Sequence, residues 1–315
     1  MADLEQLPMV GCVEVSGDCL YDGVHEELQA RLLNGSITPY DMASFCKEHP
    51  DAVADGLRSS LISHKSPYVR LCSAWSLGEI GNSEDMPLLQ RAYAQEDEDN
   101  VRTNIAWAQF MIDIDQIGEE HFRDFLLDDY YVIPLVAVKR LSGMPHLVGK
   151  YDFASYYDNQ DNQLVSLEML RNIRSFQIHE DINVKLGAEL RTTDNMLDKS
   201  ALIKAIGATN QIDSMEALMS YYYEFRSDVL GSELLADSMV SAFLSLGQSD
   251  AYEILQEIYA NQSGQAIRWK IVESLAGGSG PRSLDVLRNI HSYEQDPNIK
   301  NTVQSFIDMT RVTVS

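Results

Sequence analysis

The sequence predicts an all-α fold, a right-handed α-solenoid of about seven to eight helical hairpins. Three observations predict it. Pairs of short segments carry apolar residues at helical spacing, such a pair returns about every 32 residues, and 45% of the 315 residues are hydrophobic. This composition is enough for a large core. Stacking is expected because one hairpin cannot bury its apolar face alone.

The clearest hairpin spans residues 66–93, "SPYVRLCSAWSLGEIGNSEDMPLLQRAY". Ser66 and Pro67 suit the start of its first helix, and Gly81 favours a left-handed end to it. Ser83 is a candidate cap for the second helix. The two apolar stripes are Val69, Leu71, Cys72, Trp75, Leu77 and Ile80, then Met86, Leu88, Leu89 and Ala92. Helices this short, joined by a few residues, are expected to pack antiparallel.

The same hairpin pattern recurs in later parts of the chain. The counterparts of Val69–Arg70 are Val101–Arg102, Ile133–Pro134, Ile267–Arg268 and Ile299–Lys300. The counterparts of Leu77–Gly78 are Ile206–Gly207, Leu246–Gly247 and Leu275–Ala276. We expect the small residues to let neighbouring helices approach closely. We expect Arg70, Arg102 and Arg268 to reach a carboxylate or carbonyl group of an adjacent repeat.

These residues carry a resemblance to a known family. The stretch "VRLCSAWSLGEIGNSEDMPLL" resembles the HEAT-like repeat named after phycobilisome lyases. The resemblance implies a repeat array over residues 38–315. It leaves residues 1–37 as an N-terminal segment, of which "VHEELQARLL" reads as a helix that caps the array. It also implies an alternative function, that of a bilin (tetrapyrrole) lyase or chromophore-handling protein, although it lies in scaffold positions and not in catalytic ones.

The net charge limits the class of partner. The chain has 48 acidic and 24 basic residues, a formal charge of −24. This argues against nucleic acid and anionic membranes, which require an excess of Lys and Arg, and favours a basic protein partner. A generally acidic surface is the alternative interpretation. No leader peptide or membrane span is expected, and the scattered cysteines are typical of reduced thiols, so a cytoplasmic location is predicted.

Acidic residues are densest between residues 84 and 129, where 13 acids face three bases. We expect stacking to align them into one ridge, on which a basic partner docks. The alternative interpretation is that they complement helix N-termini and solvate the surface. The candidate partner-binding acids are Asp97, Glu98, Asp99, Asp113, Asp115, Glu119, Glu120 and Asp124.

Two stretches interrupt the repeat pattern. Residues 151–163, "YDFASYYDNQDNQ", predict a loop, and residues 226–236 predict an insertion or a loop between repeats. Aromatic side chains in a loop are available to a partner, since Tyr and Phe are common at protein interfaces. Tyr151, Phe153, Tyr156 and Tyr157 are therefore added to the candidate partner-binding residues.

No catalytic, cofactor or metal-binding residues are predicted. The chain has two His–Glu dyads, His25–Glu26 and His179–Glu180, whereas the HEAT-repeat deoxyhypusine hydroxylases hold two irons with four such dyads. The sequence therefore favours a non-enzymatic scaffold or adaptor that binds another protein through a concave acidic face. A testable version is an acidic neutraliser or chaperone for a basic protein.

Overall fold

A computed structural model describes residues 38–48, 50–247, 251–262, 264–277 and 281–314. These residues form α-helices and short 3₁₀ turns, and one isolated bridge between Asp152 and Gln177 is their only β-type pairing. The all-α prediction is confirmed. The predicted N-terminal cap, residues 1–37, lies outside the described residues.

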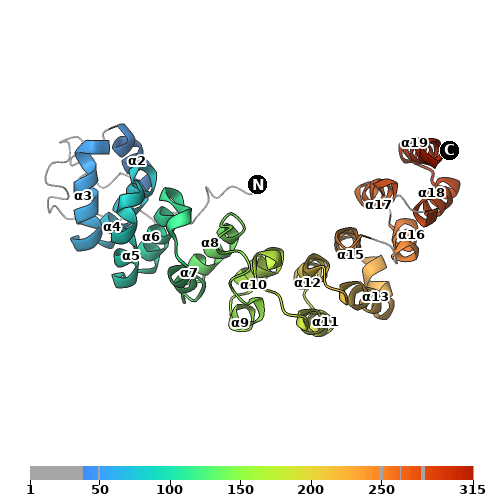
Figure 1. Ribbon diagram of the computed structural model, residues 1–315, viewed down its shortest axis with the longest axis horizontal. Helices are drawn as coiled ribbons and strands as arrows, with labels where there is room; N and C mark the ends of the chain where they lie inside the picture. Colours follow the sequence, from blue (N-terminus) through green and yellow to red (C-terminus); the bar gives the residue numbers. More distant parts are fainter. Residues whose placement is uncertain (1–37, 49, 248–250, 263, 278–280, 315) are drawn as a thin grey trace. The chain divides into compact units, whose positions relative to one another are not determined.

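The chain divides into two compact units, Met1–Val148 and Gly149–Ser315. In the first unit, α2, α4, α6 and α8 pack side by side as one layer, and α3, α5 and α7 form a second layer against them (Figure 1). The helices are α2 (Pro39–Glu48), α3 (Pro50–Ser63), α4 (Pro67–Ile80), α5 (Met86–Gln95), α6 (Asp99–Ile112), α7 (Glu119–Leu126) and α8 (Val132–Leu141).

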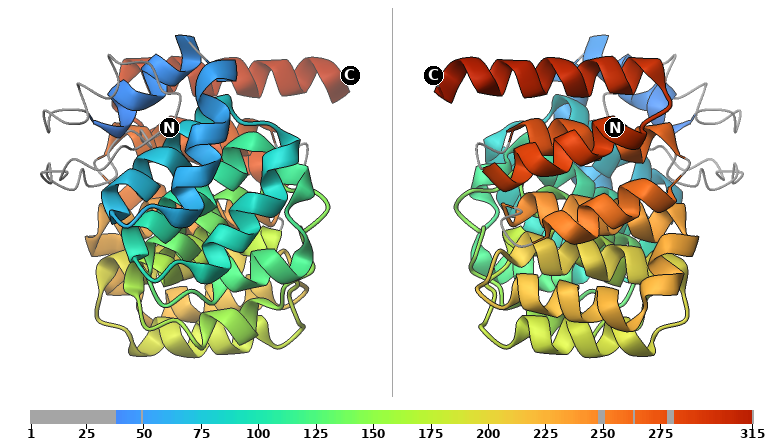
Figure 2. Two further views of the ribbon diagram at one scale, coloured as in Figure 1. Left: turned by 90° about the vertical axis from the view of Figure 1, so that its left-hand side faces the viewer. Right: turned by 90° about the vertical axis from the view of Figure 1, so that its right-hand side faces the viewer.

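The second unit repeats this arrangement. Its first layer is α10, α12, α15, α17 and α19, and its second layer contains α11, α13, α16 and α18. Figure 2 shows the last helix, α19, running across α18 and extending beyond it. The helices are α9 (Phe153–Tyr157), α10 (Gln163–Arg171), α11 (Ile182–Thr192), α12 (Met196–Thr209), α13 (Ser214–Glu224), α14 (Arg226–Gly231), α15 (Glu233–Ser245), α16 (Tyr252–Asn261), α17 (Gln265–Gly277), α18 (Pro281–Tyr293) and α19 (Pro297–Val314).

Hairpins are therefore the building unit, as predicted. Within the described residues, the first unit holds three complete hairpins (α2–α3, α4–α5 and α6–α7) and the second holds four (α10–α11, α12–α13, α15–α16 and α17–α18). This number agrees with the predicted seven to eight. The right-handed sense of the stack stays a prediction.

Helix ends in the clearest hairpin differ in detail from the prediction. Pro67 is the first residue of α4, but the Ser66 side chain forms no capping hydrogen bond. Asn82, and not Ser83, caps the turn that follows, because its side chain accepts from the Glu84 N–H. Gly81 has extended backbone, with φ −70°. Glycine is needed there for space, since a Cβ atom would lie 2.5 Å from the Leu77 carbonyl oxygen.

The predicted close approach of helices is found at Gly78 and Gly207. It is not found at Gly247, which follows the end of α15 with φ +81° and where a Cβ atom would meet nothing within 4 Å. A Cβ atom on Gly78 of α4 would lie 2.7 Å from the Trp107 ring and 3.0 Å from the Ala108 Cα of α6. A Cβ atom on Gly207 of α12 would lie 2.6 Å from the Ala242 Cα of α15. Adjacent first-layer helices can pack this closely only because neither glycine carries a side chain.

The two irregular stretches are partly helical, which corrects the loop predictions. Residues 151–163 include α9, where the Asp152 side chain accepts a hydrogen bond from the Ser155 N–H. Residues 226–236 include the short helix α14 and the start of α15. The side chain of Val229 in α14 is completely buried, so this insertion packs against the repeats.

Candidate functional site

Three arginines join consecutive hairpins in the same way. Arg70 donates to Glu96, Arg102 to Asp128 and Arg268 to Glu294, at 2.7, 2.9 and 2.9 Å respectively, and each pair is 26 residues apart. We name these three ion pairs the arginine ladder. The expected reach of each arginine to the adjacent repeat is confirmed.

Each ladder acid lies in the loop between two hairpins and has further partners. The carboxylates of Glu96, Asp128 and Glu294 each accept a backbone N–H two residues later. Asp128 also accepts from the Tyr93 hydroxyl at 2.6 Å, and Glu294 accepts from the Tyr259 hydroxyl. Only 6%, 8% and 1% of the Glu96, Asp128 and Glu294 side chains are exposed. These acids therefore serve the stack and are not available to a partner.

The environment of the ladder shifts several pKa values. Burial opposes ionisation of Glu96, but hydrogen bonds from Arg70 and from backbone N–H groups outweigh it, so the pKa of Glu96 is lowered. The pKa of Glu294 is lowered in the same way, against burial, by Tyr259, backbone N–H groups and Arg268. Burial and the adjacent carboxylate raise the pKa of Tyr93 and of Tyr259. The carboxylates are thus held ionised and the phenols neutral.

The candidate acids fall into separate groups at the two ends of α6. Asp97, Glu98 and Asp99 are exposed and lie in the loop before α6 and in its first residue. Asp113, Asp115, Glu119 and Glu120 lie in the turn after α6 and at the start of α7. Asp124 is exposed on α7. A 14-residue helix is about 21 Å long, which separates the two groups.

This separation corrects the prediction of one acidic ridge. A hairpin places its connecting turn and its incoming loop at opposite ends of its helices, so acids in both sites cannot align. Asp113 is also engaged, since it accepts from Ser83 at 2.9 Å and from Gln116 at 3.0 Å. Asp99 pairs with Arg102 at 2.9 Å. Neither Asp97 nor Glu98 has an ion-pair partner among the described residues.

A groove of about 280 Å³ adjoins Asp97 and Glu98. It lies between the C-terminal ends of α3 and α5. Its lining residues are Leu61, Ile62, Ser63, His64, Arg70, Ala92, Gln95, Glu96, Asp97 and Glu98. Ile62 is 41% exposed, so an apolar side chain stands beside the unpaired carboxylates. We name Ile62, Asp97 and Glu98 the acidic loop edge. It can accept cationic and apolar groups of a partner.

The predicted aromatic site is wrong for three of its four residues. Tyr151, Phe153 and Tyr157 are 2%, 0% and 9% exposed, so they belong to the core. Phe153 stacks on Tyr157 at 5.0 Å, and the Tyr157 hydroxyl donates to Glu189 at 2.8 Å. Tyr156 is half-buried. Because α9 is a helix packed on α10, Phe153 and Tyr157 face inward and not toward a partner.

Two features were missed from the sequence. Trp75 and Trp107 stack at 4.2 Å between α4 and α6, and their 32-residue separation could have predicted this contact. A second groove lies between α16 and α18, lined by Glu253, Gln256, Glu257, Ala260 and Tyr293. An alignment of the repeats on their ladder residues could have indicated this groove, because it shows which positions differ from one copy to another.

The described residues contain no group of three or more His, Cys, Asp and Glu side chains that could hold a metal ion. His179 of the second His–Glu dyad lies 3.2 Å from Asp152. The dyad His25–Glu26 lies outside the described residues. In the part of the chain that the structure describes, no helix has the length and apolarity to cross a membrane.

Comparison with known proteins identifies the repeat type. A family model for HEAT repeats matches residues 45–108, which run from α2 through α6. This segment contains the first two steps of the stack, including the Arg70–Glu96 pair. A search of curated proteins found no match.

Proposed function

Because this chain is a HEAT-like repeat protein, and HEAT repeats are generally scaffolds for protein interactions, we propose that it is a non-enzymatic scaffold for a basic protein partner. The acidic loop edge of the first unit is the proposed docking surface. The observation that carries this proposal is the exposure of Asp97 and Glu98, without ion-pair partners among the described residues, along a groove.

The arginine ladder explains why Asp97 and Glu98 form no ion pairs with the arginines beside them. Arg70 and Arg102, two bases at this edge, form ion pairs with Glu96 and Asp128. The neighbouring Asp97 and Glu98 are near enough for their charge to help raise the pKa of Arg70, but neither forms an ion pair with Arg70 or Arg102. Exposed carboxylates that form no ion pair, beside a groove, attract a basic surface and increase its rate of encounter. Ile62 adds an apolar contact next to them.

The competing function is that of a bilin lyase or chromophore-handling protein. A tetrapyrrole requires a largely apolar cavity with a few convergent polar groups. Half of the ten residues that line the first groove, and three of the five that line the second, have charged or amide ends. The geometry therefore favours the scaffold.

The test is affinity capture from cells that express the protein, followed by mass spectrometry, with three forms of the full chain. The first is unchanged, the second carries Asp97→Lys and Glu98→Lys, and the third carries Asp115→Lys and Glu119→Lys at the opposite end of α6. We expect basic proteins to be enriched on the unchanged chain and retained on the third form. We expect the second form to lose them, and 0.3 M salt to release them.

The third form is the control for net charge, because it makes the same charge change away from the groove. Equal loss of binding by the second and third forms would contradict a specific edge. Captured proteins with no basic bias, or binding that does not respond to salt, would exclude the proposal.

A further inference from the structure

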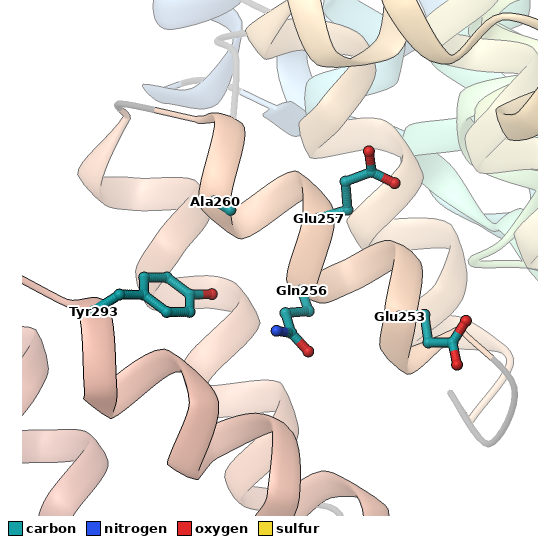
Figure 3. Close-up of a pocket in the computed structure, with 5 residues that line it drawn as sticks. All are labelled: Glu253, Gln256, Glu257, Ala260 and Tyr293. Atoms are coloured by element: carbon teal, nitrogen blue, oxygen red, sulfur yellow. The ribbon is translucent and has the colours of Figure 1, made fainter.

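The groove between α16 and α18 in the second unit has one aromatic wall and one acidic wall. Glu253, Gln256, Glu257 and Ala260 form a single stripe along α16, and Tyr293 ends α18. Figure 3 shows the Tyr293 ring pointing from α18 toward Ala260 and Gln256. The groove has a volume of about 320 Å³. Tyr293 is 38% exposed and its hydroxyl has no hydrogen-bond partner among the described residues.

An equivalent repeat in the first unit shows which of these residues the stack does not require. Tyr93, Arg102 and Asp128 form the same ladder step as Tyr259, Arg268 and Glu294, displaced by 166 residues. At the same displacement, the residues matching Glu253, Gln256, Glu257, Ala260 and Tyr293 are Pro87, Gln90, Arg91, Ala94 and Leu127. The amide and the small residue are kept, whereas the two carboxylates and the aromatic ring are found only in the second unit's copy.

The residues that differ are those that recognise a cation. The face of a tyrosine ring attracts a guanidinium or ammonium group, and carboxylates pair with it. Glu257 is partly engaged by Arg226, whereas Glu253 is exposed and has no partner among the described residues. Ala260 leaves room beside the ring. The stripe from Glu253 to Ala260 covers seven helical steps, about 10 Å, so a long side chain can lie along it.

We propose that this groove binds an arginine side chain of a basic protein partner. The guanidinium stacks on the Tyr293 ring beside Ala260 and donates to the Gln256 side-chain carbonyl, and the Glu253 carboxylate farther along the stripe attracts its charge. Arginine fits better than lysine because its planar group stacks on an aromatic face and donates in two directions. This site does not depend on the acidic loop edge, since the two surfaces share no residue.

The test is fluorescence anisotropy of a fluorescein-labelled tetra-arginine peptide titrated with the full chain in 0.1 M salt. We expect Tyr293→Leu, which installs the residue of the equivalent repeat, and Glu253→Gln each to weaken binding about threefold, and the double variant about tenfold. Ala260→Leu, which fills the groove at an exposed position, should weaken it about threefold. Glu273→Gln removes one exposed acid of α17 outside the groove and should leave binding unchanged.

Equal weakening by Glu253→Gln and Glu273→Gln would show that only net charge matters and would overturn the proposal. Unchanged binding by the Tyr293→Leu and Ala260→Leu variants would do the same. Ala260→Leu decides the result if Tyr293→Leu lowers the helix content measured by circular dichroism. The same titrations are repeated in a chain that also carries Asp97→Lys and Glu98→Lys. This separates the two surfaces, because Tyr293→Leu should still weaken peptide binding in that chain even if the acidic loop edge binds nothing.

Discussion

Arg70 and Glu96 form a two-point ion pair that joins the loops on either side of a hairpin. The Arg70 Nε and Nη2 atoms donate to the two Glu96 carboxylate oxygens, each at 2.7 Å, while Nη1 donates to the His64 carbonyl at 2.9 Å. One guanidinium thus binds the loop before its own helix and the loop of the next repeat. The 26-residue spacing between each ladder arginine and its acid follows from this geometry. Part of the chain's acidity is therefore structural, because the ladder acids are needed to join the loops.

The Arg268–Glu294 pair should contribute more to stability than an exposed pair in the same unit. Arg268→Met would leave the Glu294 carboxylate, 1% exposed, without its cation. We expect a loss of about 2–3 kcal/mol in the free energy of unfolding, less than for a fully buried pair because the arginine is 21% exposed. Urea denaturation followed by circular dichroism measures it.

The control is Arg288→Met, which breaks the exposed Arg288–Asp285 pair on α18. Its effect should stay within about 0.5 kcal/mol. Similar losses for the two variants would show that the ladder pair has no special weight.

The close approach of α12 and α15 predicts that Gly207→Ala is destabilising. Alanine favours a helix over glycine by about 1 kcal/mol, but its Cβ would lie 2.6 Å from the Ala242 Cα and Cβ atoms. We expect the steric term to win, with a net loss of about 1–3 kcal/mol in thermal or urea unfolding. Gly231→Ala, where a Cβ would meet nothing within 4 Å, should be neutral or slightly stabilising. Destabilisation by both variants to the same extent would argue against the packing explanation.

The fold and the ladder could be predicted because both repeat. Apolar periodicity and the apolar–Gly pairs at Gly78 and Gly207 report contacts that more than one copy makes, so these copies support one another. Arg70, Arg102 and Arg268 stood out for the same reason. A carboxylate or a carbonyl group was expected as the partner of each, and in the structure each pairs with a carboxylate. Only their exact partners, 26 residues later, required the geometry.

The aromatic site could not be predicted because it lies where the pattern breaks. Without periodicity, residues 151–163 gave no sign of a short helix, and Tyr151 and Phe153 gave no sign of burial. The prediction of one acidic ridge was wrong for a different reason. Sequence density says nothing about which end of a helix a residue occupies, so Asp97 and Asp115 looked close although α6 separates them.

The Tyr93 hydroxyl is predicted to stabilise the ladder step at Asp128. Tyr93 is 6% exposed, and its hydroxyl donates to the Asp128 carboxylate at 2.6 Å. Tyr93→Phe would remove a hydrogen bond to a mostly buried charge, and we expect a loss of about 1–2 kcal/mol in urea unfolding. Tyr223→Phe, at a 58% exposed position, is the control and should have no measurable effect. An unchanged midpoint for Tyr93→Phe would mean that water replaces the phenol without cost.

The surroundings of His121 predict a loss of stability on mild acidification. Its ring is packed between Tyr93 and Phe125, with centroids at 5.5 and 4.5 Å, and its Nε2 lies 2.7 Å from the Gln109 side-chain oxygen. Burial lowers the pKa of His121 below its usual range, although the Asp124 carboxylate, 3.9 Å away, opposes this. Between the folded pKa and about 6.5, the unfolded chain binds a proton that the folded His121 does not. Stability should therefore fall as pH drops below about 6.5.

His121→Gln should remove this contribution, so the variant should lose less stability than the unchanged chain between pH 7.5 and 5.5 in urea unfolding. Asp124→Asn should enlarge the loss, because it removes the charge that favours protonated His121. The acids that titrate at lower pH remain in His121→Gln, which makes the difference between the two curves specific to His121. An NMR titration of the ring protons gives an independent measurement. A midpoint at or above 6.5, or parallel pH curves for the unchanged chain and His121→Gln, would contradict the prediction, since either result would mean that folding does not disfavour the protonated ring.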